Sequence, residues 1–232
     1  MTPMILAILS RARRTPFAWL AAAALACGSA ASAAAQSPAT GSLLVASPEM
    51  SDPMFTRAVV LVLRHDEQGT IGVVLNRPTN LVPAEIFPEL KDSVGSYAGS
   101  LFRGGPIAPT RLVYLVRGLA AANVSGPEVL DKVFLSVDDA SLPDMVRLAD
   151  GTNDLRLYAG HVAWVPGQLQ SEIAAGGWQV LRATPELVFH ADPGSLWMEL
   201  EGRGGSGSDL VASAQALTAP RAFGIFARSA FK

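Results

Sequence analysis

Three short apolar runs separated by two polar loops form the most regular pattern in the chain. The runs are Leu43–Ala46, Ala58–Leu63 and Ile71–Leu75. Runs of this length, rich in valine and leucine, are typical of buried strands. The first loop contains Pro48 and Pro53, which fix the backbone and remove amide donors, whereas the second loop, HDEQG, has the length of a hairpin connection. This stretch therefore predicts three strands, the last two antiparallel, that nucleate a sheet.

The remainder of the chain continues with apolar runs between turn signals, and no internal repeat is visible. Further strands are predicted at Leu112–Val116, Lys132–Val137, Leu155–Trp164 and Trp178–Leu181. Helices are predicted near residues 84–90, at Leu142–Ala149, from Pro166 to Gly176, and at Ser195–Leu200. The pair Gly104-Gly105 before Pro106 indicates a tight turn or a close approach of two backbone segments. Together these elements predict one mixed α/β domain over residues 42–201.

Two of the predicted helices carry end signals. Asp138-Asp139 precedes the helix at Leu142–Ala149 and is expected to cap its first turn. Pro166 is favoured in the first turn of the following helix, and Gly176-Gly177 is expected to end that helix.

The first 35 residues have the pattern of a secretory signal peptide. Arg11, Arg13 and Arg14 precede an apolar run that is too short to span a membrane comfortably, and small residues follow up to Ala35. Cleavage near Ala35 would give a periplasmic or secreted protein. The alternatives are an uncleaved anchor and a membrane-anchored lipoprotein attached through Cys27.

Composition and charge narrow the possible partners. Half of the residues are hydrophobic and only 16% are charged, which fits a folded domain. The formal net charge is −2 and no basic run occurs, which argues against nucleic acid as a partner. Cys27 is the single cysteine, so a cleaved chain would have no disulfide and no thiolate metal site. The predicted organisation is a signal peptide over 1–35, a linker over 36–41, the domain over 42–201, and a Gly/Ser linker and tail over 202–232.

Four ordered blocks of residues resemble the YqgE/AlgH family of bacterial proteins. They are Gly41–Ala46 with Asp52–Phe55 and Arg57; His65, Gly69 and Gly72–Pro78; Gly104–Pro106 with Arg111; and Gly160, Ala163-Trp164, Gly167–Leu169, Glu172 and Trp178. The resemblance implies an α+β domain with a strongly bent, mainly antiparallel sheet flanked by helices. It implies no established activity or cofactor, although the family is linked by name to alginate regulation. This chain departs from the family pattern in three places: its signal peptide, the fourth block, where His161-Val162 and Gln170 differ from the usual residues, and the region beyond about residue 200.

The polar residues of these blocks share a place at strand ends and turns, where they are candidate ligand-binding residues. Arginines there would clamp an anionic ligand bidentately, or would brace the loops by pairing with carboxylates and backbone carbonyls. For the tryptophan of the set, a core or interface anchor is the alternative to a stacking platform. The candidates are Asp52, Arg57, His65, Asn76, Arg77, Arg103, Gly104, Gly105, Trp164 and Gln168.

Motifs for catalysis or metal binding are not evident in the sequence. His65 beside Asp66 and His190 near Asp192 do not match a known ligand spacing. The G-x-S-x-G nucleophile elbow and the phosphate-binding loop are also absent from the sequence. We therefore expect no metal and no cofactor.

Two classes of function follow from these observations. The first is a non-enzymatic binding or regulatory module in the cell envelope, whose partner is a protein or a small anionic ligand. The second is an enzyme of unknown reaction with a cleft lined by Arg57, His65, Asn76 and Arg103. The family label adds a third class, a transcriptional regulator, which would require a chain that stays in the cytoplasm.

Overall fold

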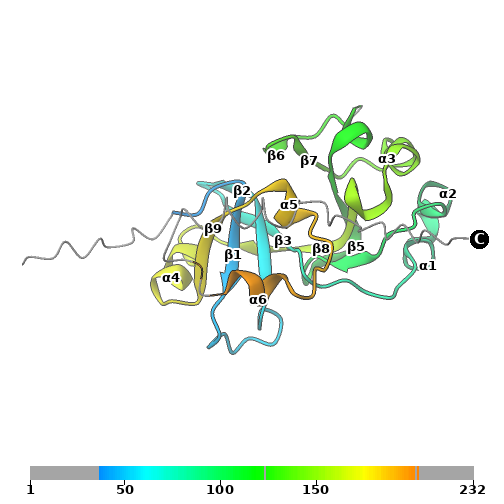
Figure 1. Ribbon diagram of the computed structural model, residues 1–232. Helices are drawn as coiled ribbons and strands as arrows, with labels where there is room; N and C mark the ends of the chain where they lie inside the picture. The colour runs from blue at the N-terminus through cyan, green and yellow to red at the C-terminus, as the bar shows by residue number, and fades with distance from the viewer. Residues whose placement is uncertain (1–36, 123, 202, 204–232) are drawn as a thin grey trace, which may run out of the picture. The chain divides into compact units, whose positions relative to one another are not determined.

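A nine-stranded sheet organises the part of the chain that the structure describes. The structure is a computed structural model, and it describes residues 37–122, 124–201 and 203 (Figure 1). The predicted signal peptide and nearly all of the predicted tail lie outside the described residues. The strands are β1 (Ser42–Ala46), β2 (Val59–Asp66), β3 (Gly69–Val74), β4 (Leu101–Arg103), β5 (Ile107–Val116), β6 (Glu128–Leu130), β7 (Val133–Ser136), β8 (Leu155–Trp164) and β9 (Trp178–Arg182).

The helices of the described residues are all short, and none is long and apolar enough to cross a membrane. The α-helices are α1 (Pro83–Ile86), α2 (Lys91–Val94), α3 (Leu142–Leu148), α4 (Gln168–Ala174), α5 (Pro185–Val188) and α6 (Leu196–Leu200). Three 3₁₀ helices complete the set: η1 (Pro88–Leu90), η2 (Gly118–Ala121) and η3 (Gly151–Asn153). Figure 1 shows α4, α5 and α6 near β1 and β9, whereas α1, α2 and α3 lie toward β5.

The order of the strands is β6-β7-β5-β8-β3-β2-β1-β9, and β4 joins β8 outside this path. Every pairing between named strands is antiparallel except that of β4 with β8. The fold class that the family resemblance implies is therefore confirmed: an α+β domain whose curled, mainly antiparallel sheet is flanked by helices.

The three predicted strands at the start of the domain are confirmed as β1, β2 and β3. Leu43 pairs with Leu61, and Leu61 pairs with Val73, so both neighbours of β2 are antiparallel. The hairpin between β2 and β3 is tighter than predicted, because Asp66 pairs directly with Gly69. Its connection is only the exposed Glu67-Gln68, since Gly69 adopts a φ of 127° that closes the turn.

The long strand β8 joins the two parts of the sheet. Its first half pairs with β5 on one side and with β4 on the other, and its second half pairs with β3. Gly160, with a φ of 70°, lies between these halves. Gly104-Gly105 passes close to this point: a Cβ atom on Gly104 would lie 2.3 Å from the Gly160 oxygen. The close backbone approach predicted for Gly104-Gly105 is confirmed.

Several predicted features differ in the structure. Asp138 and Asp139 do not cap α3, because its N-cap is Ser141 and no side-chain cap bond forms. Asp138 instead accepts a hydrogen bond from the Ala140 amide, and Asp139 accepts one from the Tyr114 hydroxyl. The strands β4 and β6 and helix α5 were not predicted, because three or four residues carry too little periodicity to be recognised.

All three tyrosines of the chain are buried in the described domain. Tyr97 donates to the Leu155 oxygen at 3.0 Å and Tyr114 donates to Asp139. Burial raises the pKa of each hydroxyl, and that of Tyr158 rises to about 12 although the Arg156 charge opposes the shift. Because the unfolded hydroxyls ionise near 10.0, their contribution to stability is complete below that pH. This contribution is lost as the pH rises from there toward the folded pKa values.

We expect an alkaline titration to produce no tyrosinate absorbance until the protein unfolds, because all three hydroxyls ionise more readily in the unfolded chain. The measurement is ultraviolet absorbance of tyrosinate recorded in parallel with circular dichroism. The two signals are expected to change in one transition. Tyrosinate absorbance that develops near pH 10, while the circular dichroism stays native, would contradict the burial of these side chains.

Candidate functional site

Asn76 holds the end of the β1–β2 loop against the end of β3. Its buried side chain accepts a hydrogen bond from the Val59 amide at 2.9 Å and donates one to the Arg57 oxygen at 2.8 Å. Both polar ends of the amide are thereby satisfied inside the protein, as burial of an amide requires. Asn76 therefore fixes the backbone conformation of Arg57.

Arg77 adds a second set of contacts to the same loop. Its guanidinium donates to the backbone oxygens of Thr56, Arg57 and Asn76. Partial burial, and after it the positive charge of Arg103, lower the pKa of Arg77. The Arg103 amide in turn donates to the Arg77 oxygen at 2.9 Å, which brings β4 to this end of the sheet.

Arg57 has an unusual backbone conformation. Its φ is 55°, in the left-handed region that residues other than glycine rarely adopt. The exposed side chain extends over Trp197 of α6, with the guanidinium carbon 5.5 Å from the ring centroid. We call Arg57, Arg77 and Arg103 the arginine cluster. Within the described residues, none of the three forms an ion pair with a carboxylate.

Asp52 lies in the same loop, but its bonds stay within the loop. Its carboxylate accepts from the Met54 amide at 2.8 Å, and its backbone oxygen accepts from the Thr56 hydroxyl at 3.0 Å. The turn predicted at Asp52-Pro53 is present, and Asp52 braces it. Asp52 thus positions the loop that carries Arg57.

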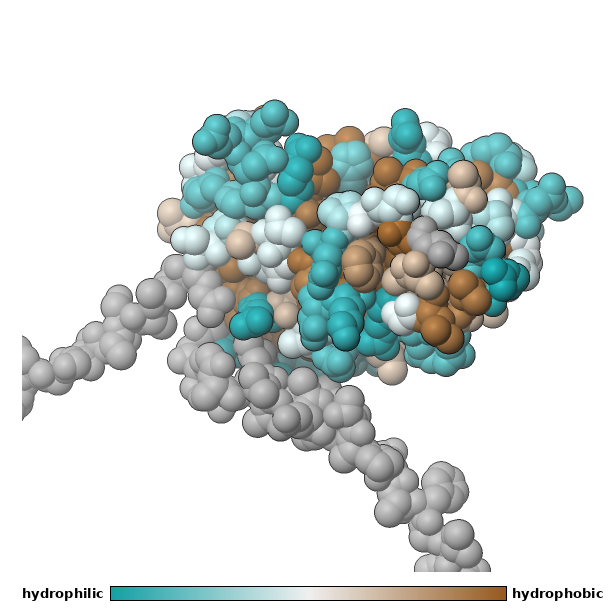
Figure 2. All heavy atoms as spheres, turned by 90° about the horizontal axis from the view of Figure 1, so that it is seen from above, coloured by the Kyte–Doolittle hydropathy of each residue, from teal (hydrophilic) through white to brown (hydrophobic). Residues whose placement is uncertain are grey.

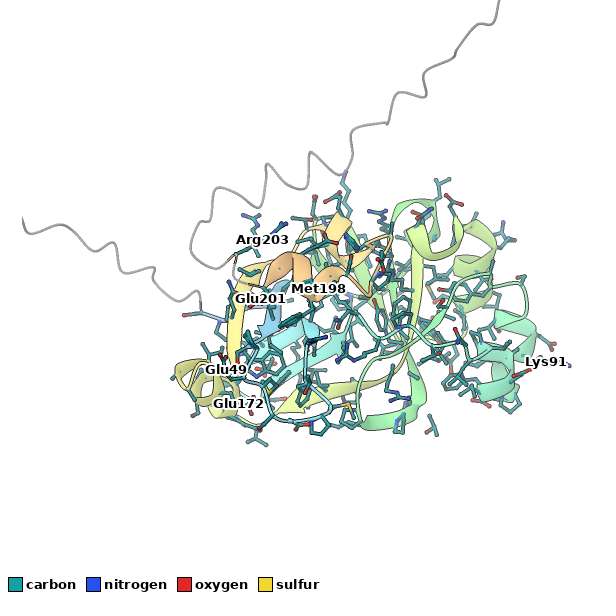
Figure 3. All side chains as sticks on the ribbon, turned by 60° about the horizontal axis from the view of Figure 1, so that its bottom comes forward. Glu49, Lys91, Glu172, Met198, Glu201 and Arg203 are labelled. Carbon is teal, nitrogen blue, oxygen red and sulfur yellow. The ribbon has the colours of Figure 1, made fainter. Side chains whose placement is uncertain are left out.

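A second group of residues surrounds Glu172 on α4. We call this group the tryptophan cluster, and it consists of Phe55, Trp164, Gln168, Glu172 and Trp178. Glu172 accepts the indole N–H of Trp164 at 3.0 Å and that of Trp178 at 2.8 Å, and the Gln168 amide bonds its other oxygen at 2.9 Å. The ring of Phe55 packs against both indoles, with centroids 6.2 Å from Trp164 and 5.4 Å from Trp178, and the two indoles contact each other at 5.9 Å. Figure 3 shows Glu172 beside α4, close to the β1–β2 loop. These contacts anchor α4 on the sheet.

The remaining candidates lie away from the arginine cluster. His65 bonds Thr70 at 2.6 Å and approaches Gln170 of α4 at 3.3 Å, at the hairpin end of β2 and β3. Thr70 and Asn76 are six residues apart on an extended segment, which separates them by about 20 Å. Gly104 and Gly105 are buried against the backbone of β8. Within the described residues, no three His, Cys, Asp or Glu side chains form a group that could hold a metal ion.

The candidates therefore divide between several places in the fold. The structure brings together Arg57, Asn76, Arg77 and Arg103 at one end of the sheet. Asp52 lies in the loop that carries Arg57, but its carboxylate bonds the Met54 amide and forms no ion pair with these arginines. Trp164 and Gln168 belong to the tryptophan cluster, and His65 contacts a neighbouring part of α4. Four residues that contact these groups were not among the sequence candidates: Phe55, Glu172, Trp178 and Trp197. The need of a buried indole N–H for an acceptor is a signal that could have pointed to Glu172.

Comparison with known proteins agrees with this arrangement. The model of the AlgH-like family (DUF179) matches residues 43–206, which is most of the chain and nearly all of the described domain. The chain belongs to the AlgH-like family. This membership confirms the resemblance found in the four sequence blocks.

Relatives of this AlgH-like chain are known from several bacteria. A UPF0301 protein of Streptomyces avermitilis is 39% identical over 171 residues, covering 69% of this chain and 84% of the relative. A UPF0301 protein of Thermobifida fusca is 37% identical over 183 residues, covering 75% of this chain and 91% of that relative. The solution structure of AlgH from Pseudomonas aeruginosa matches with a TM-score of 0.60 at 25% identity, covering 77% of this chain and 96% of that one. These names give the family but no specific activity.

Proposed function

We propose that this AlgH-like protein is a non-enzymatic binding and regulatory module of the cell envelope. The observation that carries the proposal is the use made of the candidate polar residues. The side chains of Asn76 and Arg77 form hydrogen bonds with the backbone at the end of the β1–β2 loop, and these bonds hold Arg57 in a fixed conformation. This is preorganisation of a surface, which favours binding, and it involves no pairing of a nucleophile with a base.

The enzymatic alternative would require Arg57, His65, Asn76 and Arg103 to share one cleft. His65 bonds Thr70 at the hairpin end, whereas Asn76 lies about 20 Å farther along the extended chain. Catalytic groups have to reach one substrate within hydrogen-bonding distance. A cleft of these four residues is therefore disfavoured, and the binding role accounts for the arrangement better.

The surface also bears on the kind of partner. Hydrophobic and hydrophilic residues are interspersed over the face seen in Figure 2. Of the large exposed hydrophobic side chains in the described domain, Leu81, Val82 and Ile86 lie together at α1, and the others belong to separate segments: Ile107, Leu119, Val137, Val165 and Met198. A docking face for an apolar partner would gather such residues in one broad patch. Outside α1 the exposed hydrophobic residues are spread over separate segments, which favours a polar or charged partner there.

The envelope location in this proposal rests on the N-terminal sequence. Arginines, an apolar run and small residues up to Ala35 match the three parts of a signal peptide. An exported protein of this kind would act in the periplasm and would not contact chromosomal DNA. A direct role in transcription is therefore not part of the proposal.

The test is to express the full chain, fractionate the cells and determine the mass of the recovered protein. We expect a periplasmic protein that begins near Gln36, because cleavage after Ala35 follows the small-residue rule. A mass that includes lipidated Cys27 in the membrane fraction would support an envelope role with a different anchor. Recovery of a chain with intact Met1 in the cytosol would contradict the proposal.

A further inference from the structure

The three residues of the arginine cluster are adjacent through backbone contacts, among them the Arg103 amide, which donates to the Arg77 oxygen at 2.9 Å. The charge of Arg103 acts on the partly buried Arg77, and the Arg77 guanidinium bonds the backbone of Arg57. In the described part of the chain none of these arginines forms an ion pair with a carboxylate. Like charges held close together raise the free energy of the folded protein unless an anion compensates them. A bound anion would supply the compensating charge that the described residues lack.

The backbone conformation of Arg57 is a second observation that supports a binding site here. A φ of 55° is costly for arginine and would be adopted more easily by glycine or asparagine. Asn76 and Arg77 hold this conformation through the Arg57 oxygen, and Trp197 supports the guanidinium from α6. Backbone strain that several neighbours maintain is a feature of functional sites. The strain is accounted for if the Arg57 side chain itself is needed at this position.

We propose that Arg57, Arg77 and Arg103 bind the phosphate or carboxylate group of a small anionic ligand. This rests on the binding role proposed above and names its ligand class. Guanidinium groups match both oxyanions because their planar donors form paired hydrogen bonds with two oxygens. Arg77 is fixed by its backbone contacts, whereas Arg57 and Arg103 are exposed and carry the charges that reach the ligand.

The test is isothermal titration calorimetry of the purified protein with inorganic phosphate and, separately, with citrate at low ionic strength. We expect at least one of the two anions to bind. The anion that binds more tightly shows whether the natural ligand presents a phosphate or a carboxylate group. The double variant R57N/R103Q is expected to bind that probe at least about tenfold more weakly, because it loses two charge-assisted contacts. Asparagine tolerates the left-handed conformation, so the unfolding midpoint should stay close to that of the parent.

The matched control is the double variant R147Q/R182Q, which removes two exposed charges elsewhere. Arg147 lies on α3, and Arg182 pairs with Ser42 at the opposite end of β1 from the loop. If the control weakens binding as much as R57N/R103Q does, net charge explains the binding and the site is refuted. Failure of both probes to bind also refutes it.

Two further measurements keep the outcome decisive. If R57N/R103Q does not fold, R103Q alone tests the site, because the Arg103 side chain is exposed and the substitution keeps the backbone amide that bonds Arg77. Undiminished binding by a folded R103Q would contradict the proposal. The location of the protein is measured independently by its N-terminal mass, so a failure of anion binding leaves the envelope role standing, and a cytosolic protein leaves the anion site standing.

Discussion

Replacing Gly105 with alanine is expected to destabilise the protein by about 3 kcal/mol or more, or to prevent folding. A Cβ atom at Gly105 would lie 2.2 Å from the carbonyl carbon and oxygen of His161 in β8. These are backbone atoms of the strand that joins the two parts of the sheet, so neither side can move without breaking ladder hydrogen bonds. Chemical denaturation followed by circular dichroism gives the free energy of unfolding.

Gly194 provides the control for this substitution. The nearest atom to a Cβ at Gly194 is a side-chain oxygen of Asp192 at 3.3 Å, and the position is exposed. Gly194→Ala should leave stability nearly unchanged, since only a flexible side chain has to give way. A Gly105→Ala variant as stable as Gly194→Ala would contradict the close packing of the Gly104-Gly105 turn against the backbone of β8.

Replacing Glu172 with alanine is expected to cost about 2–4 kcal/mol of unfolding free energy. The change removes the acceptor of two indole N–H groups, those of Trp164 and Trp178, whose rings are almost fully buried. Each buried donor left without a partner carries the full cost of its desolvation. The measurement is the free energy of unfolding, followed by tryptophan fluorescence.

Glu172→Gln separates the lost hydrogen bonds from the lost charge. The amide oxygen of glutamine can accept from both indoles, which bond the same carboxylate oxygen in the native protein. This variant should therefore retain most of the stability that the alanine variant loses. The amide nitrogen of this variant replaces the oxygen that accepts from Gln168, so that one bond is lost. Equal losses in the two variants would contradict the assignment of the stability to the indole hydrogen bonds.

The sequence predicted the strands well where packing leaves a strong pattern. Residues 58–63 are apolar at every position because β2 lies in the middle of the sheet and is buried on both faces. The strands β4 and β6 have three residues each, and their pairing depends on neighbours brought in by the rest of the fold. Asp138-Asp139 resembled a helix cap, but Asp139 bonds Tyr114 across the fold instead. Local signals cannot anticipate such a competing partner.

The sequence identified most of the arginines and polar residues of the candidate site, but it showed only in part which of them lie together in the fold. Position at strand ends correctly drew attention to Arg57, Arg77 and Arg103, which the fold brings to one end of the sheet. The same reasoning also selected His65, although the hairpin predicted at HDEQG already placed His65 at the opposite end of the Ile71–Leu75 strand from Asn76. The contact of Arg57 with Trp197 joins residues from opposite ends of the domain, and no local pattern reveals it.

The most direct test of the binding account is to map the ligand on the protein by amide chemical shifts. The isotope-labelled protein would be titrated with citrate and with inorganic phosphate. If the arginine cluster binds the anion, the largest shifts will occur at Thr56–Ala58, Asn76-Arg77 and Arg103, which contact one another at one end of the sheet. Shifts centred on Gln168–Ala174 and the hairpin at His65, or spread evenly over the domain, would contradict binding at this cluster.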